Sequence, residues 1–159
     1  PPLLRGLLAS PLGPLLVEFD SGGRLHGLAF GSAPNGAPAV ATAPAPVVRA
    51  VAAYFAGDMR AFDSIELDPP GTPFQREVWA ALRGIPAGTT TTYGRLAAAL
   101  GRPGSSRAVG LANGANPVAI VVPCHRVIGA SGSLTGYGGG IERKRWLLDH
   151  ERRATEVTE

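Results

Sequence analysis

The chain has few of the residues that build disulfides and zinc sites. Its 159 residues include one cysteine and three histidines, which excludes an internal disulfide and a zinc site made of several cysteines. No apolar run approaches the roughly 20 residues that a membrane-spanning helix needs. The first residues also lack the charged-then-apolar pattern of a signal peptide. We therefore predict a soluble, cytoplasmic protein without a metal ion, and its one thiol needs an explanation.

The net charge of +3 is distributed unevenly along the chain. Residues 1–72 hold four arginines and six acidic residues, whereas residues 73–153 hold eleven basic residues and four acidic ones. A segment this basic is typical of proteins that bind a phosphate backbone. Arginines solvated on helix surfaces would give the same count. Charge alone therefore leaves both interpretations open.

The first part of the chain has the pattern of a small α/β domain. Residues 6–30 alternate apolar stretches with Gly/Pro turns and predict three strands. Val47–Phe55 has the apolar spacing of a helix. The run Asp68–Gly71, two prolines followed by a glycine, then interrupts the pattern. We place a domain boundary there, between an N-terminal domain over 1–71 and a second domain over 72–159.

The second part of the chain has the outline of a helix-turn-helix. Helical patterns cover Pro73–Leu82, Tyr93–Leu100 and a third segment that Ser105 or Ser106 caps and that extends to about Asn113. Two helices joined by a turn of three to four residues form a helix-turn-helix. Many helical domains contain such a pair, so the outline alone assigns no function.

An apolar run and a glycine-rich segment surround the cysteine. Pro117–Pro123 has the length and composition of a strand and ends directly before Cys124. Residues 129–140 include six glycines, which predict a loop or a small hairpin. A final amphipathic helix is predicted from about Ile141 to His150 or Glu151.

Cys124 has two possible interpretations. A lone cysteine after an apolar run is often a small buried hydrophobic residue. However, Pro123 ends strand pairing directly before the thiol, and His125 and Arg126 follow it. Cationic neighbours lower a thiol pKa from about 8.5, and cysteine with histidine is the minimal pair for an activated nucleophile. Adjacent side chains often point apart, so proton transfer would need a bridging water.

Several motifs of the second part resemble the O6-alkylguanine-DNA alkyltransferases, also called methylated-DNA–protein-cysteine methyltransferases. The resemblance covers roughly residues 72–151, whereas residues 1–71 are only loosely similar. It implies an α/β fold in which a small N-terminal β-sheet plus helix domain packs on a mainly helical C-terminal domain with a helix-turn-helix. The matching motifs are Tyr93–Ala97, Arg107–Gly110, Asn113–Pro117, Val122–Ile128, Gly136–Gly140 and Trp146–Glu151.

The resemblance assigns roles around the thiol. Cys124 would be the alkyl acceptor, which Pro123 holds in position. His125 would be the base that acts through a water, and Glu151 would orient and polarise it. Asn116 matches the asparagine that braces the active-site turn.

The resemblance also assigns roles in contacting the damaged base. Tyr93 would donate to guanine N3 and promote rotation of the nucleotide, and Arg107 would enter the duplex in place of the extruded base. Tyr137 would pack on the alkylated base. Val127 and Gly138 would recognise base edges through backbone atoms.

The resemblance implies repair of double-stranded DNA through its minor groove, where a slim helix fits and base readout is degenerate. The alkyl group of O6-alkylguanine would pass irreversibly and stoichiometrically to the cysteine. Whether O4-alkylthymine is also repaired stays open. We expect no cofactor, no membrane and no obligate protein partner, so the protein would be a monomer. The remaining residues of the expected DNA-contacting helix are Ser106, Ala108, Gly110 and Asn113.

Two other functions remain as alternatives. One is a protein that recognises alkylated DNA without transferring the group, and the other is a cysteine hydrolase that uses Cys124 and His125. A hydrolase would turn over repeatedly and would need neither Arg107 nor the basic segment. Outside the site, we predict that Trp79 and Trp146 belong to the core. The basic run Arg143, Lys144 and Arg145 is predicted to be a solvated face.

Overall fold

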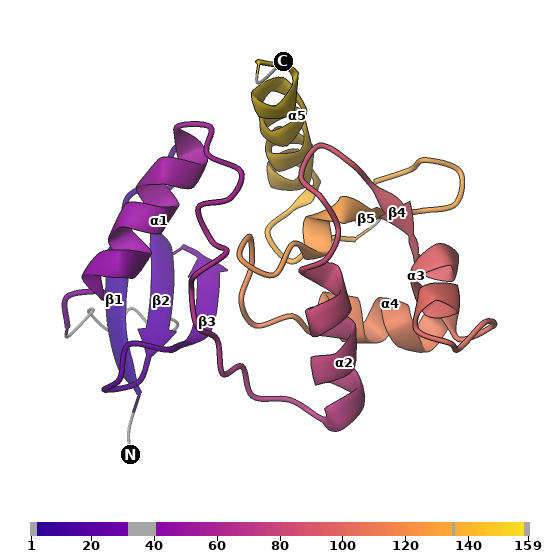
Figure 1. Ribbon diagram of the computed structural model, residues 1–159, viewed down its shortest axis with the longest axis horizontal. Coiled ribbons are helices and arrows are strands. Elements are labelled where there is room, and N and C mark those ends of the chain that lie inside the picture. Colours follow the sequence, from indigo (N-terminus) through magenta and orange to yellow (C-terminus); the bar gives the residue numbers. More distant parts are fainter. Residues whose placement is uncertain (1–2, 32–40, 135, 158–159) are drawn as a thin grey trace. The chain divides into compact units, whose positions relative to one another are not determined.

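The computed structural model describes residues 3–31, 41–134 and 136–157. The chain forms two compact units (Figure 1). The first, here called the N-terminal unit, contains Pro1–Pro70 and Pro117–Val121, and the C-terminal unit contains Gly71–Asn116 and Val122–Glu159. The chain therefore returns to the first unit for five residues, Pro117–Val121, and leaves it two residues before the cysteine.

The N-terminal unit is a three-stranded antiparallel sheet with one helix. Strands β1 (Leu4–Leu8), β2 (Leu15–Phe19) and β3 (Leu25–Phe30) pair in the order β1-β2-β3. Helix α1 (Ala45–Phe55) lies along the sheet (Figure 1). The predicted three strands and helix are confirmed, with boundaries that differ by one or two residues.

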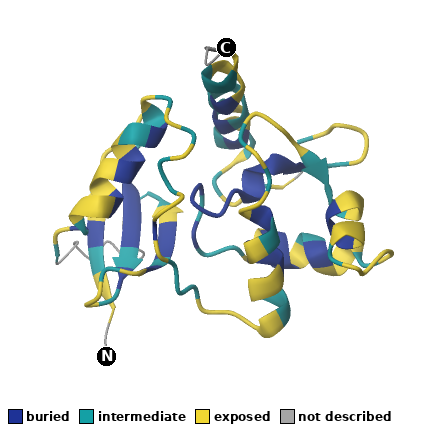
Figure 2. Cartoon of the chain, viewed as in Figure 1, coloured by how far each residue is buried: buried dark blue, intermediate teal, exposed yellow. Residues whose placement is uncertain are grey.

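The core of this unit lies between α1 and the sheet (Figure 2). The central strand is buried along nearly its whole length, and Leu15 and Val17 are completely inaccessible to solvent. From the helix, Val47, Val51 and Tyr54 are buried against it at the spacing of one helical face. Burying an aliphatic side chain of this size contributes about 1.5–3 kcal/mol, so these contacts hold the small sheet together.

The C-terminal unit begins with a capped helix. Thr72 accepts a hydrogen bond from the Gln75 N–H at 3.1 Å, and Gln75 accepts one from the Thr72 N–H at 2.9 Å. This capping box satisfies two of the free donors at the start of α2 (Pro73–Leu82). Further along α2, the buried Trp79 indole donates to the Ala112 carbonyl at 2.8 Å. That bond ties α2 to a helix more than thirty residues away.

The predicted pair of helices is present as α3 (Tyr93–Ala99) and α4 (Ser106–Gly114). Thr92 caps α3 by accepting a hydrogen bond from the Arg95 N–H at 3.2 Å. Ser105 occupies the N-cap of α4, but its side chain makes no capping hydrogen bond, so the predicted serine cap is wrong in that respect.

The apolar run Pro117–Pro123 is not a strand, contrary to the prediction. Only Val118 pairs with another strand, in a parallel bridge with Leu28 of β3, and a turn follows. Within that turn Ile120 has a φ of 70°, a left-handed conformation that a β-branched residue rarely adopts. The run is apolar because most of it is buried, and burial gives the same pattern in a strand and in a turn.

A short turn, a pair of two-residue strands and a long helix complete the C-terminal unit. The 3-10 turn η2 (Cys124–Arg126) leads into β5 (Val127–Ile128), which pairs in parallel with β4 (Thr91–Thr92). Helix α5 (Ile141–Val157) continues beyond the predicted end near Glu151, because no helix-breaking residue follows it. Among the described residues, no helix is long and apolar enough to cross a membrane.

Candidate active site

Cys124 begins the turn η2 and is 8% exposed. Its backbone N–H donates to the Val122 carbonyl at 2.8 Å. Pro123, which is also buried, precedes it and supplies no backbone donor. The thiol is therefore held at a tight chain reversal, away from any strand ladder.

Two asparagines brace this reversal. The Asn116 amide donates to the Val122 carbonyl at 2.8 Å, and its side chain also forms a hydrogen bond to the Cys124 thiol. The Asn113 amide donates to the Cys124 carbonyl at 3.4 Å from inside α4. Asn113, which the resemblance predicts among the DNA-contacting residues, is only 5% exposed and faces the cysteine turn.

His125 and Glu151 form a buried pair beside the cysteine. Both side chains are completely buried, and Nε2 of His125 lies 2.7 Å from Oε2 of Glu151. Arg126 donates to the same carboxylate through Nε at 2.8 Å and Nη2 at 2.9 Å. Its Nη1 donates to the Ile85 carbonyl at 2.6 Å. Glu151 is thus held by three charge-assisted or polar contacts, which fixes its orientation.

The electrostatics of the pair favour a neutral histidine and an ionised glutamate. Burial lowers the pKa of His125, and this outweighs the opposing effect of Glu151. Burial alone would raise the pKa of Glu151, but hydrogen bonds and charge from His125 and Arg126 hold it well below its usual range. In this state Nε2–H donates to the carboxylate, so Nδ1 is the nitrogen that can take a proton. Nδ1 has no hydrogen-bond partner among the described residues.

Lys144 is buried, contrary to the predicted solvated face. It is completely inaccessible to solvent, and its ammonium donates to the Val127 carbonyl at 2.8 Å. Burial lowers its pKa. Lys144, Leu147 and Glu151 are spaced by three and four residues, so they share one buried face of α5. The sequence signal for this burial is that Lys144, the only lysine of the chain, falls on the same helix face as Leu147 and Glu151.

The thiol pKa reflects these opposing neighbours. Burial raises the pKa of Cys124, whereas the hydrogen bond from Asn116 and the charge of Lys144 lower it. Burial also raises the pKa of Tyr137, and the charges of Cys124 and Glu151 add to that effect. Tyr137 therefore belongs electrostatically to the same cluster. Val127 is buried directly after the turn, and Gly138 is exposed in the glycine-rich loop.

The other candidates lie on the helix-turn-helix. Tyr93 begins α3 and is half-buried, and its ring lies near Gly110, where a Cβ atom would be 3.6 Å from the Tyr93 Cδ1. Ser106, Arg107 and Ala108 are exposed in the first turn of α4. Helix α4 thus carries exposed residues that are predicted to contact DNA at its start, and it contacts the cysteine turn through Asn113.

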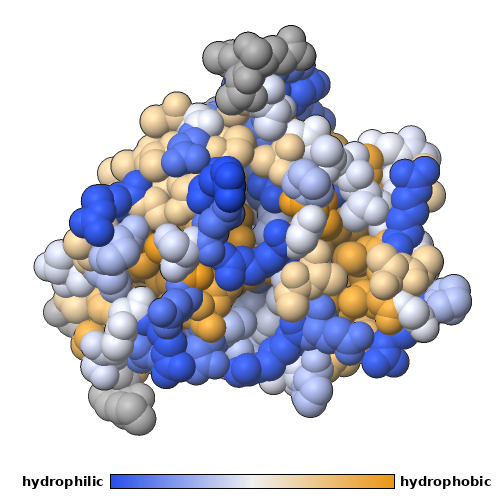
Figure 3. Space-filling view, viewed as in Figure 1, coloured by the Kyte–Doolittle hydropathy of each residue, from blue (hydrophilic) through white to orange (hydrophobic). Residues whose placement is uncertain are grey.

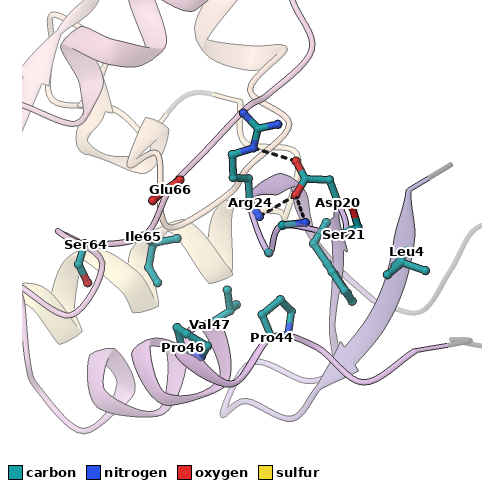
Figure 4. A pocket seen from close by; sticks show the side chains of 13 residues that line it. Leu4, Asp20, Ser21, Arg24, Pro44, Pro46, Val47, Ser64, Ile65 and Glu66 are labelled. Carbon is teal, nitrogen blue, oxygen red and sulfur yellow. Dashed lines mark hydrogen bonds and ion pairs between the residues drawn. The ribbon is translucent and has the colours of Figure 1, made fainter. Parts of the chain in front are cut away.

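The N-terminal unit contains a separate cavity of about 470 Å³ (Figure 4). Asp20, Arg24, Val47 and Ile65 are among the residues that line it, and Arg24 donates to Asp20 at 2.9 Å. None of its lining residues belongs to the cluster around Cys124. In the described ranges, no group of three or more His, Cys, Asp or Glu residues could hold a metal ion.

Two family models together match nearly the whole chain. Residues 3–69 match the ribonuclease-like domain of 6-O-methylguanine DNA methyltransferase. Residues 73–153 match the DNA binding domain of the same protein.

Individual relatives are similar over most of their lengths. The methylated-DNA–protein-cysteine methyltransferase of Salmonella typhimurium is 50% identical, and the alignment covers 94% of this chain and 95% of the relative. The crystal structure of Mycobacterium tuberculosis OGT in complex with DNA superposes with a TM-score of 0.83 and 49% identity, covering 93% and 92% of the two chains. The enzyme of Pyrococcus kodakaraensis has a TM-score of 0.69 and 29% identity, with 94% and 99% covered.

Proposed function

The chain belongs to the 6-O-methylguanine DNA methyltransferase family, and from this premise we propose that it repairs DNA by transferring the alkyl group of O6-alkylguanine to Cys124. The observation that carries the proposal is the buried arrangement of thiol, histidine and glutamate in one turn and one helix. A nucleophile, a base and a group that orients the base are the parts that such a transfer needs.

The first step is activation of the thiol. Nδ1 of His125 takes the Cys124 proton through a water, because Nε2–H is already held by Glu151. The imidazolium that forms is stabilised by the carboxylate of Glu151, whose low pKa keeps it ionised. Asn116 and Lys144 stabilise the thiolate, since both lower the pKa of Cys124.

The second step is transfer of the alkyl group. The Cys124 sulfur attacks the alkyl carbon, the new S–C bond forms, and the C–O6 bond to guanine breaks. Tyr93 donates a proton to N3 of the guanine leaving group, which stays in the DNA strand as a neutral base. The tyrosinate regains a proton through solvent, and the imidazolium of His125 releases the proton that it took from the thiol. A thioether is stable and no described group is placed to remove it, so each molecule acts once. O4-alkylthymine is a further candidate substrate of the same chemistry.

Access to the base requires its extrusion from the duplex, which costs a few kcal/mol. Helix α4 enters the minor groove with Ser106, Ala108 and Gly110 near the backbone, and Arg107 fills the gap that the base leaves. The extruded base lies against Tyr137, and backbone atoms of Val127 and Gly138 bind its edges. Pro123 keeps the thiol aimed at it.

We also propose that the protein works as a monomer in the cytoplasm on double-stranded DNA that contains alkylated bases.

The test is mass spectrometry of the intact protein and its peptides after mixing with a duplex that contains one O6-methylguanine. We expect one methyl group on the peptide of Cys124 and one equivalent of lesion consumed per protein. Cys124→Ser is the control: it should bind the duplex and gain no methyl group. Tight binding by the native chain without a mass change would instead support recognition of alkylated DNA without transfer. Repeated turnover would support a hydrolase.

A further inference from the structure

Helix α4 carries the most exposed large hydrophobic side chain among the described residues. Leu111 is 72% exposed, whereas the other exposed large hydrophobic side chains range from 38% to 44%. Hydrophobic side chains also lie among hydrophilic ones on the face seen in Figure 3, so a single exposed leucine does not by itself mark a binding surface. The evidence that Leu111 belongs to a binding surface comes from its position on α4.

Leu111 shares a helix face with Arg107. The two residues are four positions apart, which places them one turn apart on the same side of α4. Both are exposed, and Arg107 makes no ion pair with any described residue. The exposed residues beside them, Ala108, Gly114 and Ala115, are small. Leu111 and Arg107 therefore project from an otherwise slim surface.

The opposite face of α4 is firmly anchored. Val109 and Ala112 are buried, and the Trp79 indole donates to the carbonyl of Ala112, the residue after Leu111. On the same side Asn113 donates to the Cys124 carbonyl. The helix that presents Leu111 is thus tied at two consecutive residues to the rest of its unit, including the turn that holds the thiol. These hydrogen bonds fix the position of α4, and therefore the position from which the Leu111 side chain projects.

We propose that Leu111 is an apolar wedge that enters the minor groove of duplex DNA beside Arg107 and stabilises the distorted step from which the damaged nucleotide is extruded. The inference rests on the proposed function and adds a positioning residue to it. Leucine is among the side chains that separate base steps from the minor groove. The neighbouring unpaired cation favours DNA as the occupant, because a phosphate backbone supplies the complementary charge.

The experiment compares Leu111→Ala with Leu111→Met and with Val48→Ala, an exposed apolar residue of α1 in the other unit. Single-turnover rates are measured on a duplex with one O6-methylguanine and on the free base O6-benzylguanine. We expect Leu111→Ala to slow the duplex reaction about tenfold, or about 1.4 kcal/mol, and to leave the free-base rate unchanged. Leu111→Met should restore most of the duplex rate, and Val48→Ala should behave as the native chain.

The salt dependence of duplex binding distinguishes an apolar contribution of Leu111 from a contribution of charge. Leu111→Ala should weaken binding without changing the slope of log K against log salt, whereas Arg107→Ala should reduce that slope by about 1. A native duplex rate in Leu111→Ala would overturn the proposal, and Leu111 would then serve another partner or none. An equal loss on duplex and free base would also overturn it, because the role would be structural. If the native chain transfers no methyl group at all, the proposed function itself fails.

Discussion

The imidazole of His125 and the carboxylate of Glu151 are 26 residues apart in the chain and 2.7 Å apart in the structure, with both side chains fully buried. Arg126 donates to both oxygens of the same carboxylate. A carboxylate in this position keeps one histidine nitrogen protonated and leaves the other available to the thiol.

Glu151→Gln should slow methyl transfer by at least about 100-fold, the lower end of what general acid–base catalysis contributes. The amide cannot stabilise the imidazolium of His125. The same change leaves the buried Arg126 without its partner, which should lower the free energy of unfolding by about 3 kcal/mol. Stopped-flow transfer rates and urea unfolding measure the two effects. Asp149→Asn, on the same helix but in a partly exposed pair with Arg152, is the matched control and should change neither by much.

Stability should decrease as the pH falls from neutral. The pKa of His125 is lowered on folding from its ordinary value of 6.5, so below that pH the unfolded chain binds a proton that the folded chain does not. The pKa of Glu151 is lowered from its ordinary value of 4.5, which adds a second loss below that pH. Urea unfolding between pH 8 and pH 4 measures this. His125→Asn should flatten the loss between about pH 7 and pH 5.

Lys144→Met should make the thiol less reactive at neutral pH. The charge of Lys144 lowers the pKa of Cys124, so its removal should shift the pH profile of alkylation to higher pH, by about one unit for about 1.4 kcal/mol of lost stabilisation. The rate of iodoacetamide modification as a function of pH gives the profile. Arg145→Met removes an adjacent exposed charge and should leave the profile in place. An unchanged pH profile in Lys144→Met would show that the lysine does not activate the thiol. Its role would then be the hydrogen bond to the Val127 carbonyl.

Arg107→Ala should slow repair of duplex DNA much more than the reaction with a free base. If the arginine fills the space of the extruded nucleotide, the loss should be at least about tenfold on a duplex, or about 1.4 kcal/mol. The same comparison with O6-benzylguanine should show little change, since no base is extruded. Arg83→Ala, at the end of α2, is the control for losing an exposed arginine. Equal slowing on both substrates would contradict the role of Arg107.

Much of the fold could be predicted from the sequence because it follows from local patterns. The alternation in 6–30 predicts the sheet, and the apolar spacing of Pro73–Leu82 predicts α2. The motif around Cys124 pointed to the family through its residue order, which does not depend on knowing the fold. These features depend on residues close together in the chain.

The tertiary structure decided what depends on contacts between distant segments. The buried run before Cys124 forms a turn, because burial gives a turn and a strand the same apolar composition. Asn113 faces the cysteine turn because α2 covers the adjoining side of α4. Lys144 is buried because it shares a helix face with Glu151, and only the packing of α5 determines that this face is the inner one. The sequence alone thus determined which groups are present, and the packing of helices and turns determined which of them meet.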